Sequence, residues 1–192
     1  MGTSRLRVAV DATALLGVRT GVARVTAGLI EHLAERDDLE VVAYAVTWRG
    51  RNQLPTVLPP SVTSATRPFP ARLSRMLWTR VPVPRVEFWT GPVDVLHATN
   101  YVSPPARAPV LLTVHDLTFL RFPELVTADA RTYVRFIQRA LDRGVTVHTD
   151  SDFVASEVQS HFGVDSKRVV AIYPGLATTT AGDRGRGHAL AD

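Results

Sequence analysis

The feature that most constrains the fold of this sequence is a series of short apolar runs, each ending at a polar residue or a glycine, separated by segments of helical periodicity. The runs that we expect to be strands are residues 7–12, 40–47, 94–98, 109–114, 145–149 and 168–173. Nearly continuous apolar runs of this length are typical of strands buried on both faces of a parallel sheet. The sequence therefore predicts an α/β fold built on a mostly parallel sheet.

Helices are expected between these runs, where apolar residues recur every three to four positions. They cover residues 21–36, 127–143 and 153–162, and Gly144 and Gly163 close the last two. Strands that alternate with helices in this way imply right-handed crossovers. We therefore expect a doubly wound, Rossmann-like sheet with helices on both faces.

Residues 48–92 are the least regular part of the sequence, because most of the 13 prolines lie there or at its margins. Within this region we expect a strand at 62–67 and a helix at 71–80. At the other end of the chain, residues 177–192 are rich in Thr, Gly and Arg and have no periodicity. The predicted organisation is one domain over 1–176 followed by a linker or tail.

Composition excludes several classes of protein. The 192 residues include no Cys, so a disulfide framework and a thiolate metal site are excluded, and a cytoplasmic location is expected. No apolar run is long enough to predict a signal peptide or a membrane span. The net charge of +4 is spread along the chain, which does not predict nucleic-acid binding.

Polar residues at the ends of the predicted strands are the candidates for chemistry, because ligands of open α/β sheets bind at the carboxyl edge. Asp11 ends the first strand and is followed by a loop that contains Gly17 and Gly21. His97 and His115 end two later strands. A histidine at such a position can donate a hydrogen bond or act as a general base near neutral pH.

Each of these features also has a plain structural interpretation. The glycine loop matches neither of the common nucleotide-binding motifs and can be a simple turn. Each histidine taken singly can be a half-buried side chain with satisfied hydrogen bonds. His97, His115 and His148 lack the compact spacing of a zinc motif, so no metal site is expected. No Gly-x-Ser-x-Gly elbow occurs, which argues against a serine hydrolase.

A basic stripe is predicted on the helix at 127–143, where Arg131, Arg135 and Arg139 recur every four residues. The stripe can be an ordinary solvated helix face. The alternative is attraction to an anionic membrane surface or to a phosphate-bearing acceptor.

Five segments at strand ends or helix starts carry a resemblance to a known family. They are Thr20-Gly21-Val22-Ala23-Arg24, Asp94-Val95-Leu96-His97-Ala98, Thr113-Val114-His115-Asp116-Leu117, Thr149-Asp150-Ser151-Asp152-Phe153 and Lys167-Arg168-Val169-Val170-Ala171-Ile172-Tyr173-Pro174-Gly175. In this order and spacing they resemble the amino-terminal domain of retaining glycosyltransferases of family 4, which have the GT-B fold. The similarity covers nearly the whole chain up to Leu176.

The resemblance implies a transferase that moves a sugar, such as a mannosyl or glucosyl group, from a nucleotide-sugar donor to an acceptor hydroxyl, with no metal or other cofactor. This domain forms the acceptor side of a two-domain cleft. By the same resemblance, Thr20, Gly21 and Arg24 face the donor phosphates, and His115 is the catalytic, sugar-contacting histidine. We expect the acceptor side of the cleft to be lined by Asp11, His97, Asn100, Tyr101 and Asp116.

The sequence also departs from the family pattern. Val154 replaces a small polar residue at the start of the helix after residue 151, so Ser151 or Asp152 is expected to cap that helix instead. No Glu is followed by another Glu eight residues later, so the family's Glu-x7-Glu motif and its donor-binding domain are missing. The chain is therefore expected to be an amino-terminal half that is inactive alone.

Two alternatives remain open at this point. One is a free-standing, non-catalytic Rossmann-like module that binds a glycan, a nucleotide or a protein. The other is a different GT-B enzyme, such as a sugar-nucleotide epimerase, which also requires a second domain.

Overall fold

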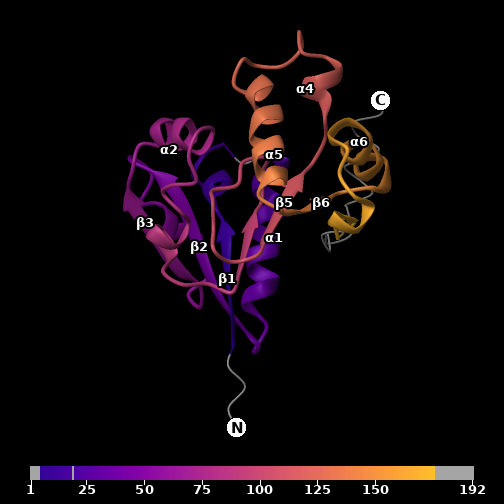
Figure 1. Cartoon of the computed structure of the whole chain (residues 1–192). Coiled ribbons are helices and arrows are strands. Elements are labelled where there is room, and N and C mark those ends of the chain that lie inside the picture. The colour runs from indigo at the N-terminus through magenta and orange to yellow at the C-terminus, as the bar shows by residue number, and fades with distance from the viewer. Residues whose placement is uncertain (1–4, 19, 176–192) are drawn as a thin grey trace, which may run out of the picture.

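The computed structural model describes residues 5–18 and 20–175, which form an α/β domain around one sheet (Figure 1). The sheet has seven strands, all parallel, in the order β3-β2-β1-β4-β5-β6-β7. The strands are β1 (Leu6–Asp11), β2 (Leu39–Thr47), β3 (Thr63–Pro68), β4 (Val95–Ala98), β5 (Val110–Val114), β6 (Thr146–Thr149) and β7 (Val169–Ala171). The order reverses direction between β1 and β4, which is where ligands of doubly wound sheets bind.

Six α-helices connect the strands, together with four short 3-10 turns. The helices are α1 (Gly21–Ala34), α2 (Ala71–Trp78), α3 (Glu87–Thr90), α4 (Thr118–Arg121), α5 (Tyr133–Asp142) and α6 (Asp152–Phe162). The 3-10 turns are Thr13–Leu16, Leu54–Val57, Ala130–Thr132 and Ser166–Arg168. No helix in the described part of the chain is both long and apolar enough to cross a membrane.

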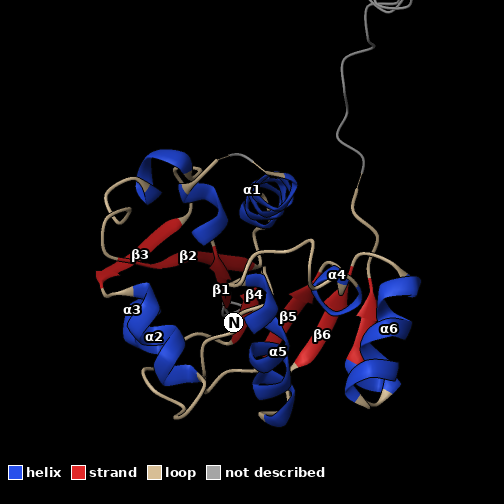
Figure 2. Ribbon diagram, turned by 90° about the horizontal axis from the view of Figure 1, so that it is seen from above, coloured by secondary structure: helices blue, strands red, loops and turns tan. Residues whose placement is uncertain are grey.

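The helices lie on both faces of the sheet (Figure 2). α1 covers the part of one face formed by β1 and β2, where Val10, Ala43 and Ile30 are fully buried. α2, α3 and α5 lie on the opposite face. α6 joins α5 in a second apolar cluster that packs on β5 and β6. The alternation of apolar side chains between the two faces follows from the strand geometry.

Local capping signals explain where the main helices begin and end. The Thr20 hydroxyl accepts a hydrogen bond from the amide of Ala23 at the start of α1, and the Ser151 hydroxyl accepts one from the amide of Val154 at the start of α6. Gly144 and Gly163 have φ values of 86° and 63°, so both adopt the left-handed conformation that stops a helix. Ser151 is thus the cap of α6, one of the two residues predicted for that role.

The predicted fold class is confirmed, and each predicted strand is present with ends shifted by a few residues. One helix differs: a 3-10 turn occupies Ala130–Thr132, and α5 begins only at Tyr133, not at 127. The Thr127 hydroxyl does accept a hydrogen bond from the amide of Ala130, but it starts the turn rather than the helix. The expected linker at 177–192 lies outside the described residues.

Candidate functional site

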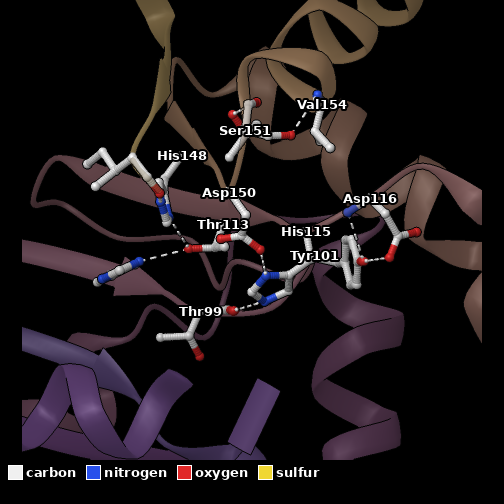
Figure 3. Close-up of polar contacts among 12 residues, drawn as sticks. Thr99, Tyr101, Thr113, His115, Asp116, His148, Asp150, Ser151 and Val154 are labelled. Carbon is white, nitrogen blue, oxygen red and sulfur yellow. Dashed lines mark hydrogen bonds and ion pairs between the residues drawn. The ribbon is translucent and has the colours of Figure 1, made fainter. Parts of the chain in front are cut away.

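The carboxyl edge of the sheet gathers the polar residues that follow four neighbouring strands. Asp11 ends β1, Thr99 to Tyr101 follow β4, His115 and Asp116 follow β5, and Asp150 follows β6. All these strands are parallel and adjacent in the sheet, so residues far apart in sequence meet at one edge. Figure 3 shows the contacts at β4, β5 and β6.

His115 lies at the centre of this edge and is held through both ring nitrogens (Figure 3). Nδ1 lies 2.6 Å from Oδ2 of Asp150, and Nε2 lies 3.1 Å from the carbonyl oxygen of Thr99. A carbonyl oxygen can only accept, so Nε2 is the donor in its contact with Thr99, and Nδ1 faces the carboxylate of Asp150. The other oxygen of Asp150, Oδ1, is buried and has no hydrogen-bond partner among the described residues.

The side chains of this pair are largely shielded from solvent. The His115 side chain is 12% exposed and that of Asp150 is 25% exposed. A carboxylate bonded to one imidazole nitrogen fixes the orientation of the ring and leaves the other nitrogen as a directed donor. His115 can therefore present an N–H group at the edge of the sheet if an incoming oxygen replaces the Thr99 carbonyl.

Tyr101 and Asp116 form a second contact beside His115. The Tyr101 hydroxyl donates to Oδ2 of Asp116 over 3.1 Å and accepts from the Asp116 amide over 3.2 Å. Burial, followed by the charge of Asp116, raises the pKa of Tyr101 well above its ordinary value. The Tyr101 ring stacks on Tyr133 at a centroid distance of 4.7 Å, and its φ of 47° is the only positive value at a non-glycine residue in the described chain.

His97 belongs to a row of hydrogen-bonded side chains that runs across β4, β5 and β6. The members of this row lie within the strands, whereas His115 follows the end of β5. Nε2 of His97 lies 2.9 Å from the hydroxyl of Thr113, and that hydroxyl lies 3.0 Å from Nδ1 of His148. Nε2 of His148 lies 3.1 Å from the carbonyl oxygen of Ile172. If both rings are neutral, each group in the row donates a hydrogen bond to the next, from His97 through Thr113 and His148 to Ile172. Burial first, then the charges of His148 and His115, lower the pKa of His97 to about 4.

A pocket of about 140 Å³ lies at the same edge, between β1, β2 and β4 and beneath α2. We call it the edge pocket. Its lining residues are Asp11, Thr13, Ala14, Tyr44, Val46, Ala71, Ser74, Arg75, Trp78, Thr99, Asn100, Val102 and Pro104. Asp11 and Tyr44 are register partners on β1 and β2, so their side chains point to the same face of the sheet. Burial raises the pKa of Asp11, although hydrogen bonds from Thr13 oppose the shift.

Two of the side chains that line the edge pocket have buried polar atoms that lack a hydrogen-bond partner among the residues that the structure describes. These atoms are the Tyr44 hydroxyl and Oδ1 of Asn100. Tyr44 is 1% exposed, and burial, followed by the Asp11 charge, raises the pKa of its hydroxyl well above the ordinary value. Buried polar atoms in native proteins nearly always have a partner, so these two call for a physical explanation.

The remaining predicted residues start α1. Thr20, Gly21 and Arg24 are exposed and form the first turn of the helix, where the Arg24 amide donates to the Thr20 carbonyl over 3.1 Å. None of the three lines the edge pocket. A helix of this length presents free amide groups and a partial positive charge at its N-terminus, which suits an anion.

The structure thus divides the predicted residues into separate places. Asp11 and Asn100 line the edge pocket, and Tyr101 and Asp116 pair beside His115, whereas His97 is 9% exposed and bonded inside the sheet. Arg131, Arg135 and Arg139 are all exposed, and membrane contact through them stays a prediction. Within residues 5–18 and 20–175, no three His, Asp or Glu side chains cluster closely enough to hold a metal ion; the absence of a metal stays a prediction too.

Sequence reasoning did not assign roles to Asp150, Thr99 or Tyr44. Asp150 follows a predicted strand just as Asp116 does, so the rule that predicted the one could have found the other. Thr99 acts through its backbone carbonyl, and Tyr44 lies inside an apolar strand. Neither of these two has a signal in the sequence.

Comparison with known proteins gives one family assignment. A family model described as Glycosyltransferase Family 4 matches residues 19–180. Among curated proteins, none matches this sequence. One similar solved structure is Phytolacca americana UGT2 complexed with UDP-2fluoro-glucose and pterostilbene, at 10% identity and a TM-score of 0.48, covering 93% of this chain and 56% of that chain.

A second solved structure is a PPC decarboxylase mutant complexed with pantothenoylaminoethenethiol. It has 16% identity and a TM-score of 0.32, covering 95% of this chain and 88% of that chain. Both structural likenesses are too distant to carry an argument about function. The family model spans most of the sequence and confirms the resemblance drawn from the five segments, so this chain belongs to glycosyltransferase family 4.

Proposed function

We propose that this domain binds the acceptor in a family 4 glycosyltransferase that transfers a hexosyl group from a nucleotide-sugar donor to an acceptor hydroxyl. A second domain, which carries most of the donor site, completes the enzyme. The described domain is inactive without it. This chain spans 56% of the length of the plant transferase structure that it matches.

The observation that carries the proposal is the placement of the His115–Asp150 pair directly beside the edge pocket. Thr99 joins them, because its carbonyl oxygen faces Nε2 of His115 while its hydroxyl donates to the Asp11 carbonyl over 2.8 Å. A directed N–H group linked through Thr99 to a polar pocket is what a transferase needs to hold an acceptor hydroxyl near a donor sugar.

His115 supplies a positioned hydrogen-bond donor in this proposal. Its ring is fixed by Asp150 from one side, and Nε2 faces the Thr99 carbonyl oxygen, which a sugar hydroxyl would have to replace. Once the Thr99 carbonyl has been displaced, the Asp150 contact still holds the ring, so the donor keeps its direction as charge develops in the transition state. That is the role we assign to His115 as the catalytic residue of this half.

The first turn of α1 supplies the contact to the donor phosphates. Thr20 caps the helix, and a Cβ added at Gly21 would meet no atom within 4 Å, so packing does not require glycine there. A glycine at an open helix start allows a ligand to approach the backbone closely. Arg24 is exposed in the same turn and adds a positive charge for the diphosphate.

The experiment is a sugar-transfer assay on the protein extended through the coding sequence downstream of Asp192. We expect that sequence to encode a second α/β domain with the Glu-x7-Glu motif. His115→Gln should lower kcat/KM by about a hundredfold, because it removes an oriented donor. His148→Gln is the matched control, since that histidine also bonds through both nitrogens but belongs to the row below the edge, and its activity should stay within about threefold of the parent.

Two results would contradict the proposal. One is unchanged transfer by the His115→Gln variant. The other is a downstream sequence without a second α/β domain, together with a 192-residue chain that transfers sugar by itself.

A further inference from the structure

We propose that one corner of the domain docks on the surface of an anionic lipid bilayer. The corner consists of residues 48–51, which follow β2, and residues 67–86, which cover the end of β3, α2 and the loop after α2. We call it the α2 corner. α2 lies at the periphery of the domain, with α3 beside it (Figure 2). The inference goes beyond the proposed function and does not depend on it.

The first argument is the distribution of charge along the chain. Residues 41–86 contain seven arginines and no Asp, Glu or Lys, and all seven lie in the α2 corner. The rest of the chain carries the other 15 basic residues and all 18 acidic ones. The positive charge is therefore not spread evenly, as the overall composition suggested, but is concentrated in one corner. Such a concentration of one sign attracts a partner of the opposite charge.

The second argument is that the described protein does not neutralise these arginines. Every ion pair within residues 5–18 and 20–175 involves a basic side chain outside the α2 corner. Arg72, Arg80 and Arg85 are exposed. A guanidinium group without a carboxylate partner can bind a lipid phosphate through paired hydrogen bonds.

The third argument is the outward face of α2, which carries large apolar side chains where a surface helix is ordinarily polar. Ser74 and Trp78 are buried and turn toward the sheet. Leu73 and Met76 lie on the opposite side of the helix and are 40% and 47% exposed. With Arg72 next to them, they give α2 the apolar and basic surface of a helix that lies in a membrane interface.

The loop after α2 extends this surface. Val81 and Val83 are both exposed. The Val81 amide donates to the Leu77 carbonyl over 2.7 Å, which folds the loop against the end of the helix. The indole N–H of Trp78 donates to the Pro84 carbonyl over 2.9 Å and holds the far side of the loop. The apolar side chains are thus positioned before a partner binds, which lowers the entropic cost of docking.

Trp48 adds an interfacial side chain at the same corner. Thr47, the last residue of β2, is the register partner of Pro68 at the end of β3, from which the chain enters α2. Trp48 follows directly, is 56% exposed and is followed by Arg49. Tryptophan is favoured at the boundary between lipid and water, because its ring is apolar and carries one polar N–H group.

These features favour a bilayer over a nucleic acid and over the arginines of α5 as the membrane contact. Exposed aliphatic side chains between arginines gain free energy in the acyl boundary of a bilayer, whereas they contribute little to binding a nucleic acid. The exposed residues of α5 are Arg135, Gln138, Arg139 and Asp142, and none of them is apolar. α5 therefore offers charge without an apolar contact.

The test is sedimentation of the 192-residue chain with two kinds of vesicle. One contains phosphatidylcholine alone, and the other contains equimolar phosphatidylcholine and phosphatidylglycerol. We expect binding to the mixed vesicles to be at least about tenfold tighter, and to weaken as salt is added, because the arginines act through a charge that salt screens.

Charge substitutions locate the binding surface. The double variant Arg72→Gln, Arg80→Gln should bind the mixed vesicles about twentyfold more weakly, since each arginine near an anionic surface contributes about fivefold. The matched control is Arg135→Gln, Arg139→Gln, which removes the same charge from the exposed face of α5. Its affinity should stay within about threefold of the parent.

Apolar substitutions separate a bilayer from a polyanion. The double variant Leu73→Ser, Met76→Ser keeps every charge and should bind the mixed vesicles about tenfold more weakly, because the contact with the acyl boundary is lost. Phe122→Ser, Leu125→Ser changes two exposed apolar residues after α4 and should bind as the parent does. Melting curves verify that all four variants are folded.

Three results would overturn the inference. They are no binding to the mixed vesicles, a loss in the α5 variant as large as that in the α2 charge variant, and undiminished binding by Leu73→Ser, Met76→Ser. Tighter binding of a DNA oligonucleotide than of the mixed vesicles at the same salt concentration would assign the corner to a nucleic acid instead. Because none of these measurements involves sugar transfer, they leave the proposed function to its own test.

Discussion

Two groups of buried polar side chains share the carboxyl edge of the sheet. They differ in how many of their polar atoms have a hydrogen-bond partner within the protein. In the histidine group, which comprises His97, Thr113, His148, His115 and Asp150, five of the six ring nitrogens lie within hydrogen-bond distance of a side-chain or backbone oxygen. The exception among its carboxylate oxygens is Oδ1 of Asp150, which has no partner among the described residues. In the edge pocket, the Tyr44 hydroxyl and Oδ1 of Asn100 have no partner within residues 5–18 and 20–175. The two groups meet at Thr99.

The difference separates a framework from a receptor. Side chains bonded to one another fix the spacing of β4, β5 and β6 and the orientation of the His115 ring. Buried polar side chains that lack partners lower the free energy of unfolding, and that loss is recovered only when a ligand bonds to them. Substitutions in the histidine group should therefore reduce stability, whereas substitutions in the edge pocket should reduce binding.

The largest expected effect is the pH dependence that His97 confers on folding. The pKa of His97 is about 4 in the folded chain, against its ordinary value of 6.5, so between those pH values the unfolded chain binds a proton that the folded chain does not. Stability that is fully present above pH 6.5 is therefore lost as the pH falls toward 4, by up to about 3 kcal/mol. Urea unfolding from pH 7 to pH 4 measures this loss.

The variant His97→Gln isolates that contribution, because the glutamine amide can still donate to Thr113 but does not titrate in this range. Its stability should fall less with pH than that of the parent. His32→Gln removes an exposed histidine and serves as the control. If His97→Gln and the parent show the same pH dependence, the histidine group is not the buried framework described here.

The next effect is the loss of one member of the His115–Asp150 pair. His115→Leu leaves both oxygens of Asp150 and the carbonyl of Thr99 without a described donor, and should lower the free energy of unfolding by about 2 kcal/mol. Denaturant unfolding at pH 7 gives the value. His161→Leu, an exposed histidine on α6, should change it by less than about 0.5 kcal/mol. Equal values for the two variants would show that the pair does not contribute to the framework.

Much of the fold could be predicted from the sequence, because buried parallel strands have a distinctive apolar pattern and Gly144 and Gly163 mark helix ends. The late start of α5 could not, since Thr127 caps a turn with the same chemistry that caps a helix. The short helices α3 and α4 have only four residues each, too few for a periodic pattern.

The candidate site was predicted in part for a related reason. The position of His115 and Asp116 after an apolar strand places them at the carboxyl edge, and the structure shows them there. The partners of His115 could not be paired from the sequence, because Asp150 is 35 residues away and Thr99 contributes a backbone oxygen that every residue type possesses. Tyr44 was missed because a tyrosine in a buried strand looks like core, and only the three-dimensional contacts reveal that its hydroxyl has no partner.

The smallest expected effect is also the most discriminating. Removing a tyrosine hydroxyl should change the free energy of unfolding in opposite directions in the two regions. Tyr101→Phe removes a hydroxyl that donates to Asp116 and should lower the free energy of unfolding by roughly 0.5 to 1 kcal/mol. Tyr44→Phe removes a buried hydroxyl without a partner among the described residues and should raise that free energy by roughly 0.5 kcal/mol, because the folded state no longer buries an unbonded polar group. Parallel denaturant unfolding of the two variants measures both values. A loss of stability in Tyr44→Phe as large as that in Tyr101→Phe would mean that the Tyr44 hydroxyl has a hydrogen-bond partner within the fold. The contrast drawn between the two groups would then be wrong.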